Sequence, residues 1–229
     1  MDSYTKLLLH GDGADGSTTI TDETGKTMTA VGNAQIDTAQ KVFGTGSILF
    51  DGTGDTVTTP DHADWQLDGG SDSNFWTVDF RVRFNGDPGA AIMGFLQQRV
   101  DDSNFWAIRL SANTLNIIVR SAASNIVLIG PAWNPAGDTW YHVAVVKDGT
   151  NGYMFFIDGT QIGTTTVDTS PIPDFGAILT IGDYSFSGSN YLNGWIDELR
   201  ISKGIARWTA NFTPPTAPYG DESNFFKLF

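Results

Sequence analysis

Apolar and polar positions alternate through residues 75–84 and predict a β-strand there. Every second residue from Trp76 to Phe84 is apolar, whereas the residues between them are polar or charged. A period of two places the two sets of side chains on opposite faces of a strand. We therefore expect this segment to be a half-buried strand of an antiparallel sheet.

Short apolar runs of the same kind recur along the chain, separated by glycine, asparagine, aspartate or proline. One such break, Asp158-Gly159, is a strong signal for a tight hairpin, because both central residues of that turn need a positive φ. Residues 13–30 are expected to form loop or edge structure, and the acidic segment 99–104 a loop. About a dozen strands at this spacing predict an all-β sandwich or barrel. The expected strands are residues 6–10, 47–50, 57–59, 75–84, 92–95, 105–110, 116–121, 125–129, 139–146, 153–157, 160–163, 179–182 and 194–201.

The composition supports an all-β domain. Aspartate supplies 23 of the 26 acidic residues, and the chain also has 26 glycines. These residues favour turns and loops over helices. A chain of 229 residues forms one or two domains and is long enough to bury its own core. The absence of cysteine excludes a disulfide scaffold, a cysteine nucleophile and a thiolate metal site.

The charge of the chain restricts its partners. The formal net charge is −13, which disfavours binding to nucleic acid and to anionic membranes and favours divalent cations. No run approaches the length of a membrane span, so membrane insertion is not expected. The first residues have neither a basic start nor an apolar stretch, so no signal peptide is visible.

Several motifs carry a resemblance to a known family. Residues 140–149 (WYHVAVVKDG) and 156–159 (FIDG) resemble the laminin-G-like branch of the concanavalin A-like lectin/glucanase superfamily. The same resemblance extends to residues 7–13, 47–52 and 194–202. It implies an all-β, concanavalin A-like jelly-roll sandwich of two curved antiparallel sheets, with residues 7–9 beside residues 196–201. The expected organisation is a laminin-G-like domain over residues 1–212, followed by a Pro-rich strap and apolar tail over residues 213–229.

The family includes both binding proteins and glycan-cleaving enzymes. Its laminarinase-type hydrolases carry a Glu-x-Asp-x-x-Glu motif, which is absent here. Asp197 and Glu198 are adjacent in an expected strand, so alternation places them on opposite faces and they cannot form a catalytic pair. His10 and His142 lie in apolar strands, where core histidines are common. We therefore expect no enzyme, although a carboxylate pair built from distant residues stays open as an alternative.

The resemblance also implies a structural calcium site. In relatives, a calcium ion ties the N-terminal strand to the last long strand, and Asp12, Asp197 and the carbonyl of Gly52 match these positions. Calcium takes about six to eight oxygen ligands, often from turns. Asp197 stands in an otherwise apolar strand and therefore needs a partner if it is buried. The alternative is that it bonds main-chain amides or Arg200 and holds no metal.

A second acidic group lies in two expected loops. Asp101, Asp102 and Asn104 precede one strand, and Asp183 follows another. In pentraxin-like and laminin-G relatives, loops in these places form a rim site where calcium meets the ligand. The glutamate and glutamine ligands of pentraxins are missing here, so a solvated acidic loop is the favoured interpretation.

The loop at residues 183–191 has the composition of a recognition loop. Tyr184, Phe186, Asn190 and Tyr191 combine aromatic faces with polar side chains, as sugar binding requires. Core or rim packing is the alternative for each aromatic residue. The other aromatic residues in expected loops are Trp65, Trp133 and Trp208.

The C-terminal tail carries four large apolar residues. Either Phe225, Phe226, Leu228 and Phe229 pack back on the sandwich, or they contact a partner such as a virion or surface-assembly protein. We expect a non-catalytic, calcium-stabilised, lectin-like module that binds a glycan or surface polysaccharide. The resemblance implies an extracellular or virion-surface protein. A structural or decoration protein that docks through this tail is the alternative.

Overall fold

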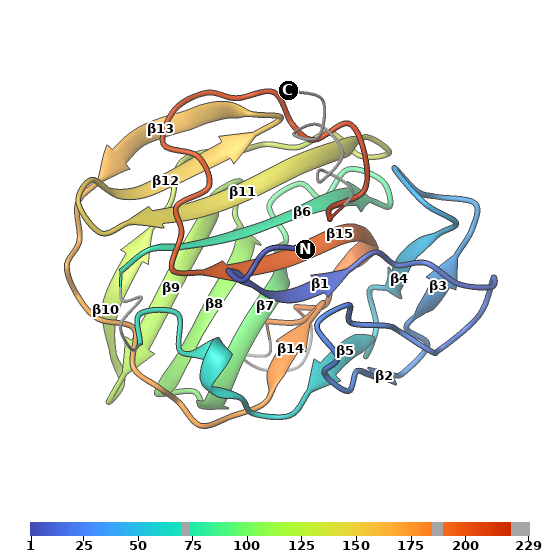
Figure 1. Ribbon diagram of the computed structural model, residues 1–229, viewed down its shortest axis with the longest axis horizontal. Coiled ribbons are helices and arrows are strands. Elements are labelled where there is room, and N and C mark those ends of the chain that lie inside the picture. The colour runs from blue at the N-terminus through green and yellow to red at the C-terminus, as the bar shows by residue number, and fades with distance from the viewer. Residues whose placement is uncertain (70–73, 185–189, 221–229) are drawn as a thin grey trace.

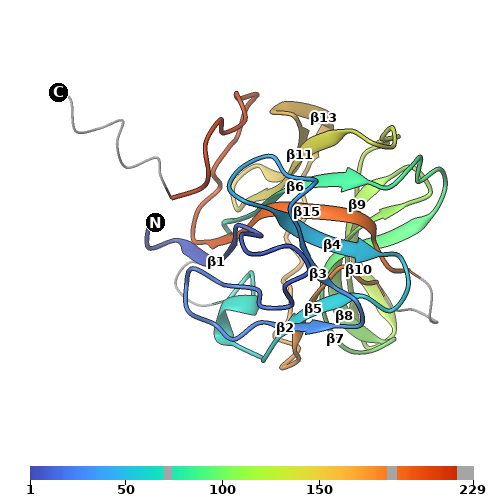
Figure 2. The ribbon, with the colours of Figure 1, turned by 90° about the vertical axis from the view of Figure 1, so that its right-hand side faces the viewer.

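The computed structural model describes residues 1–69, 74–184 and 190–220 of the chain. They form two stacked antiparallel sheets, as Figures 1 and 2 show from two directions. One short 3₁₀ helix, η1 (Ala63–Trp65), is the only helix in these ranges. The all-β jelly-roll sandwich expected from the sequence is therefore confirmed. Among the described residues, no helix has the length and apolar character needed to cross a membrane.

The 8-stranded sheet contains the long central strands. β15 lies at its centre and pairs with β6, β4 and β1. Its strands, in spatial order, are β13 (Thr160–Thr166), β12 (Gly152–Ile157), β11 (Trp140–Asp148), β6 (Trp76–Phe84), β15 (Asn193–Lys203), β4 (Ser47–Asp51) and β3 (Gln35–Asp37), with β1 (Thr5–Leu9) beside β15.

The 7-stranded sheet packs behind it in the view of Figure 1. Its strands, in spatial order, are β10 (Ser124–Ile129), β9 (Leu115–Ser121), β8 (Asn104–Ser111), β7 (Ile92–Asp101), β14 (Leu179–Ile181), β5 (Thr56–Thr59) and β2 (Thr29–Val31).

The two ends of the domain meet in one sheet, as expected. Leu7 on β1 is paired with Ile201 on β15, and Leu9 is paired with Leu199. All four side chains belong to the core between the sheets. Because residues far apart in sequence are joined here, this pairing closes the fold.

The apolar stripe of β6 fills the centre of the core. All five of its apolar side chains are fully buried between the sheets. Phe80 and Phe84 reach Phe95 of β7, with ring centroids 5.0 and 6.2 Å apart. Burial of each such side chain contributes about 1.5–3 kcal/mol, so the alternating segment 75–84 is a main source of stability.

Two local expectations differ from the structure. The strand β3 was not predicted, because its three residues contain a single apolar side chain, Ile36. The predicted acidic loop at residues 99–104 is wrong: β7 continues to Asp101, and β8 begins at Asn104. Asp101 Oδ1 accepts hydrogen bonds from the Ser103 amide and Asn104 Nδ2, which stabilises a tight turn.

Residues 204–219 cover the outer face of the 8-stranded sheet. The covering segment thus begins before the predicted Pro-rich strap, and from here on we call all of residues 204–219 the strap. In Figure 1 this red segment passes in front of the sheet after β15. Trp208 and Phe212 stack with centroids 4.0 Å apart and pack on β11 and β12. Arg81 on β6 donates a 2.6 Å hydrogen bond to the carbonyl of Pro215. The tail residues Phe225, Phe226, Leu228 and Phe229 lie outside the described residues.

Candidate functional site

A continuous row of side chains crosses the outward face of the 7-stranded sheet. On β2, β5, β14 and β7, the row carries hydroxyl and amide groups. On β8, β9 and β10, it becomes apolar. Cross-strand pairing gives the order Thr29, Thr58, Thr180, Gln97, Ala107, Ile118 and Leu128.

Thr58, Thr180 and Gln97 from the polar half of this row form the floor of a hollow of about 360 Å³. Val31 and Ile178 add exposed aliphatic surface at its margin. The hollow therefore offers hydroxyl, amide, charged and aliphatic groups together. Its lining residues are Val31, Gly54, Thr56, Thr58, Gln97, Arg99, Ile178, Thr180, Asp183 and Tyr191.

A glycine on β7 determines where the segment around residue 184 lies. A Cβ atom at Gly94 would overlap the main chain of Asp183 and Tyr184, so the absence of a side chain lets this segment cross β7. The Asn190 carbonyl accepts hydrogen bonds from the amides of Gly94 (3.1 Å) and Tyr184 (3.2 Å). A β-bridge joins Asp183 to Tyr191. The base of the predicted recognition loop is thus fixed against the sheet.

Two of the predicted ligand-binding residues face the hollow. Asp183 and Tyr191 both line it. Asp183 is 5% exposed and its Oδ2 accepts a 3.3 Å hydrogen bond from Gln97 Nε2. Asn190 contributes its main-chain carbonyl to the loop base, and Phe186 lies outside the described residues.

Tyr184 packs on the sheet and does not offer an open aromatic face. It is 3% exposed and its ring lies 5.8 Å from that of Phe105, in a small cluster with Ala107 and Ile118. The guanidinium of Arg109 lies 4.2 Å from its ring centroid. Burial raises the pKa of the Tyr184 hydroxyl, and nearby arginine charges partly oppose this. Tyr184 therefore positions its neighbours on β8.

Asp101 and Asp102 do not join Asp183. Asp183 accepts a hydrogen bond from Gln97, whereas Asp101 lies four residues beyond Gln97 on β7. This spacing places Asp101 roughly 13 Å from Gln97 along the strand. Asp102 pairs with Arg99, which lines the hollow. These acids stabilise the β7–β8 turn and orient Arg99, and the acidic rim group is not assembled.

A β-bulge in β15 changes the expected orientation of two acids. Ile196 and Leu199 both point into the core, and the pairing register with β6 shifts between Asp197 and Arg200. Glu198 has φ +53° and lies in this bulge. Both Asp197 and Glu198 therefore reach the outer side of the sheet, and the expectation of opposite faces is wrong.

Asp197 is buried beside the loop that follows β3. Its Oδ2 accepts hydrogen bonds from the amides of Val42 (2.6 Å) and Phe43 (3.1 Å), whereas its Oδ1 is buried without a partner. Burial raises the pKa of Asp197 to about 7, and the charges of Glu198 and Asp12 act in the same direction. A cation at Oδ1 would compensate this buried carboxylate.

The other two predicted calcium ligands, Asp12 and Gly52, differ in how they lie relative to Asp197. Asp12 bonds the amide and hydroxyl of Thr45 in the same loop that Asp197 contacts. Gly52 follows Asp51, which is paired with Asn193, four residues from Asp197 on β15. This separation is roughly 13 Å along the strand. Asp12 and Asp197 therefore both accept hydrogen bonds from the loop between β3 and β4, whereas Gly52 lies away from Asp197.

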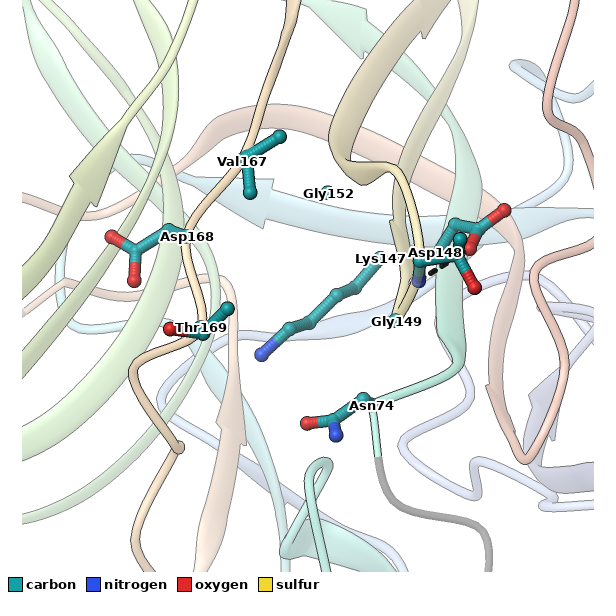
Figure 3. Close-up of a pocket in the computed structure, with 9 residues that line it drawn as sticks. Asn74, Lys147, Asp148, Gly149, Gly152, Val167, Asp168 and Thr169 are labelled. Atoms are coloured by element: carbon teal, nitrogen blue, oxygen red, sulfur yellow. Dashed lines mark hydrogen bonds between the residues drawn. The ribbon is translucent and has the colours of Figure 1, made fainter.

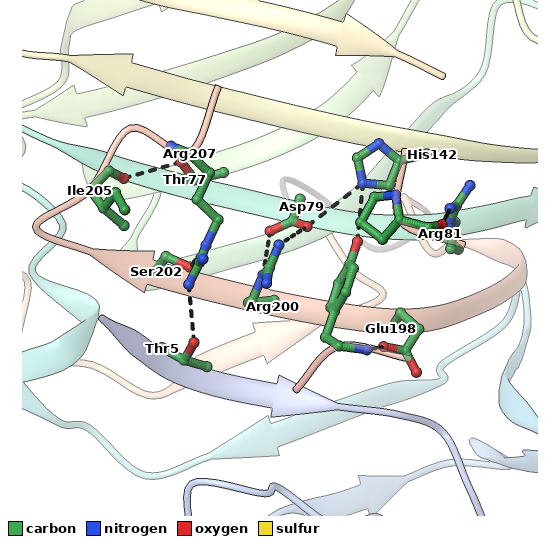
Figure 4. A network of polar contacts seen from close by, with 12 residues as sticks. Thr5, Thr77, Asp79, Arg81, His142, Glu198, Arg200, Ser202, Ile205 and Arg207 are labelled. Atoms are coloured by element: carbon green, nitrogen blue, oxygen red, sulfur yellow. Dashed lines mark hydrogen bonds and ion pairs between the residues drawn. The ribbon is translucent and has the colours of Figure 1, made fainter. Parts of the chain in front are cut away.

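His10 and His142 both belong to polar networks, but His10 follows the end of β1 and is partly exposed, whereas His142 lies within β11. His10 Nδ1 lies 2.6 Å from Glu198 Oε1, which raises the pKa of His10. His142 is fully buried below the strap, with Nε2 3.0 Å from the hydroxyl of Tyr219. Figure 4 shows this network between β11, β6, β15 and the strap.

A second, smaller pocket of about 80 Å³ lies at the end of β11. Figure 3 shows Lys147 extending into it, with Asp168 and Thr169 on one side and Asn74 on the other. Lys147 Nζ already pairs with buried Asp68 at 2.6 Å. The pocket is too small for a sugar ring, so the hollow on the 7-stranded sheet is the stronger candidate.

Sequence reasoning missed the residues that connect these features. Gln97, Arg99 and Arg109 lie within strands, where alternation alone gave no reason to select them. Of the loop aromatics, Trp65 and Trp133 are core residues, and Trp208 packs in the strap. The outward parity of β7 and β8 is the signal that could have indicated the missed residues.

Comparisons with known proteins agree with this architecture. The family model Laminin_G_3, described as concanavalin A-like lectin/glucanases superfamily, matches residues 51–207. No curated protein matches the chain.

Solved structures of similar fold include binding domains of botulinum neurotoxins. The binding domain of serotype D has 12% sequence identity and a TM-score of 0.64, covering 89% of this chain and 49% of that one. The binding domain of neurotoxin DC, in complex with rat synaptotagmin II, has 16% identity and a TM-score of 0.62, covering 89% and 48%. The receptor-binding domain of type G has 14% identity and a TM-score of 0.62, with the same coverage. The chain spans about half the length of these structures, and the likeness shows the fold alone.

Proposed function

The chain belongs to the Laminin_G_3 family of the concanavalin A-like lectin/glucanase superfamily, and from this premise we propose that it is a non-catalytic glycan-binding module. The ligand surface is the hollow on the outward face of the 7-stranded sheet. The similar neurotoxin domains are themselves binding domains, one of them in complex with a protein. Display on a virion or cell surface is the setting in which such a module would act.

The hollow is the observation that carries this proposal. Thr58, Thr180 and Gln97 offer hydroxyl and amide groups along its floor, and Tyr191 offers part of an aromatic ring at its edge. Sugars present hydroxyls and CH faces, which these groups match. A volume of about 360 Å³ lies within the ordinary range of small-ligand sites.

The acids of the hollow favour binding over cleavage. Canonical glycoside hydrolysis needs two carboxyl groups that flank the bond to be broken. Among the described residues that line the hollow, Asp183 is the only acid. Its carboxylate is held by Gln97, which suits a hydrogen-bonding role toward a ligand.

A glycan array tests this function. We expect binding to at least one glycan, with loss of affinity of tenfold or more in Gln97→Ala. Thr164→Ala, on the exposed edge strand β13 of the other sheet, is the matched control. No binding to any glycan at millimolar concentration, or release of reducing ends or unsaturated sugars, would overturn the proposal.

We also propose that calcium stabilises the fold at Asp197 and Asp12. The buried, unpartnered Oδ1 of Asp197 fits a cation, and the loop bonded by both acids could add carbonyl oxygens. Gly52 does not fit this site, because it lies four strand positions away. Calcium at a hundredfold excess over Kd should stabilise the fold by about 2.7 kcal/mol, measured as a rise in melting temperature. Asp197→Asn should abolish this rise, and an equal response to EDTA in both proteins would contradict the site.

Docking of a partner protein through the C-terminal tail is a second proposal. Tyr219, the last residue but one before the tail, is 2% exposed and donates its amide to Glu198 Oε2 at 2.6 Å. The strap is therefore anchored before the tail begins, and removal of residues 221–229 should leave the domain folded. Size-exclusion chromatography with the candidate virion or surface-assembly protein should then show loss of the complex. An unchanged complex would reject this role.

A further inference from the structure

Three arginines stand close together on the outward face of the 7-stranded sheet, next to the hollow. Phe105 on β8 is paired with both Arg99 on β7 and Arg120 on β9, and Arg109 follows on the same face of β8. The charges of all three lower the pKa of Tyr184, against the larger effect of its burial. Arg109 contacts the Tyr184 ring, and Arg99 and Arg120 are near enough for their charges to act on the same phenol, although the chain has only seven arginines.

Arg109 differs from the arginines that pair with acids. Its Nε donates a 3.0 Å hydrogen bond to Asn116 Oδ1, and its remaining contact is with Tyr184. Among the described residues, no acid pairs with Arg109, and its partial burial lowers its pKa. Elsewhere the pairs are Arg83 with Asp138, Arg200 with Asp79 and Arg207 with Asp2.

A half-buried cation without an acidic partner favours an anionic ligand. It has lost part of its hydration, and an oxyanion would restore charge-assisted hydrogen bonds. A planar guanidinium can bind carboxylate or sulfate through two parallel hydrogen bonds. Tyr184 and Asn116 hold Arg109 in place, so little side-chain freedom would be lost on binding.

We propose that the glycan recognised at the hollow is acidic, and that its carboxylate or sulfate group binds Arg109 beside Tyr184. This inference rests on the proposed function, because the neutral part of the glycan lies on the threonines and Gln97. Gln97 on the floor of the hollow is paired with Ala107, which lies two residues from Arg109 on the same face of β8. The Asp183–Tyr184 segment connects them directly.

The strong negative charge of the whole chain does not oppose this local site at physiological salt. The screening length there is about 8 Å, so distant acids act weakly on a bound anion. Binding should therefore be measured near 0.15 M salt, where the distant acids of the chain are screened.

Matched pairs of polysaccharides test the proposal. Polygalacturonate is compared with its methyl ester, and chondroitin sulfate with unsulfated chondroitin, by calorimetry or biolayer interferometry. The first pair detects recognition of a carboxylate, and the second detects recognition of a sulfate. We expect at least a tenfold preference for the charged member of one pair.

The variants assign this preference to a residue. Arg109→Gln should remove it, whereas Arg83→Gln, on the other sheet, should retain it. Arg109→Lys keeps a charge and should retain part of the preference, which guards against misfolding of the glutamine variant. Equal binding within both pairs, or a preference that survives Arg109→Gln, overturns the inference. If neutral glycans on the array bind, the proposed function still stands; if no glycan binds, both fail.

Discussion

The two outer faces of the sandwich both carry arginines, but these arginines have different partners. On the 8-stranded sheet, Asp79 and Arg200 are buried under the strap, where Arg200 Nε and Nη2 donate hydrogen bonds to the two carboxylate oxygens of Asp79 at 3.0 and 2.9 Å. On the 7-stranded sheet, Arg109 has an amide and a phenol as its partners. The first face has its charges satisfied by the chain itself, and the second leaves a cation beside an open hollow.

This difference separates a structural face from a binding face. Figure 4 shows Asp79, Arg200 and His142 held within one network below the strap. Tyr219 completes it by contacting His142 through its hydroxyl and Glu198 through its amide. A cluster of charged groups with shifted pKa values is therefore not by itself evidence of a functional site. When the chain covers such a cluster, its ion pairs stabilise the fold.

The largest effect is expected from breaking the covered pair. Asp79→Asn leaves Arg200 buried without a carboxylate and should reduce the free energy of unfolding by about 3–5 kcal/mol. Melting temperature and urea unfolding measure this loss. Asp138→Asn is the control, since its pair with Arg83 is largely exposed and contributes less than about 1 kcal/mol. Equal losses in the two variants would show that the strap does not isolate Asp79 from water.

The open face should be most sensitive at Gly94. Gly94→Ala forces the Asp183–Tyr184 segment away from β7 and should cost about 1–3 kcal/mol of stability. The affinity for glycan should fall by more than the loss of folded protein explains, because the Asp183–Tyr184 segment positions both the hollow and Arg109. Thr164→Ala, at an exposed position of the edge strand β13, is the control. Retained affinity in Gly94→Ala would place the binding site elsewhere.

The smallest expected effect is the pH dependence of the covered face. Burial lowers the pKa of His142 below its usual value of 6.5, although Asp79 partly opposes this. The unfolded chain therefore takes up a proton before the folded protein does as the pH falls below about 6.5. The stabilisation due to neutral His142 is full above that pH and is lost in acid.

Comparison with His142→Gln isolates this contribution. The difference in unfolding free energy between wild type and variant should shrink or reverse as the pH is lowered from 7.5 to 5. Urea unfolding followed by tryptophan fluorescence at each pH measures it. A difference that stays constant with pH would show that His142 titrates alike in the folded and unfolded states.

The sequence by itself determined most of the strands and the all-β class, and together with the family resemblance it indicated the jelly roll. Strand alternation, turn residues and apolar runs are local features, so they can be recognised in the sequence without knowledge of the fold. The stripe of β6 and the pairing of β1 with β15 followed from such features and from the family resemblance. The predicted loop at 183–191 also supplied two residues of the hollow, Asp183 and Tyr191.

Only the tertiary structure decided which charges are covered and which are open. Asp79 and Arg200 are 121 residues apart in sequence. No local pattern indicates that they pair with each other or that the strap buries the pair. The bulge at Glu198 and the crossing at Gly94 depend likewise on neighbours from distant strands. Strand period fixes the face on which a side chain lies, but its burial, partners and charge state depend on what the rest of the chain brings against that face.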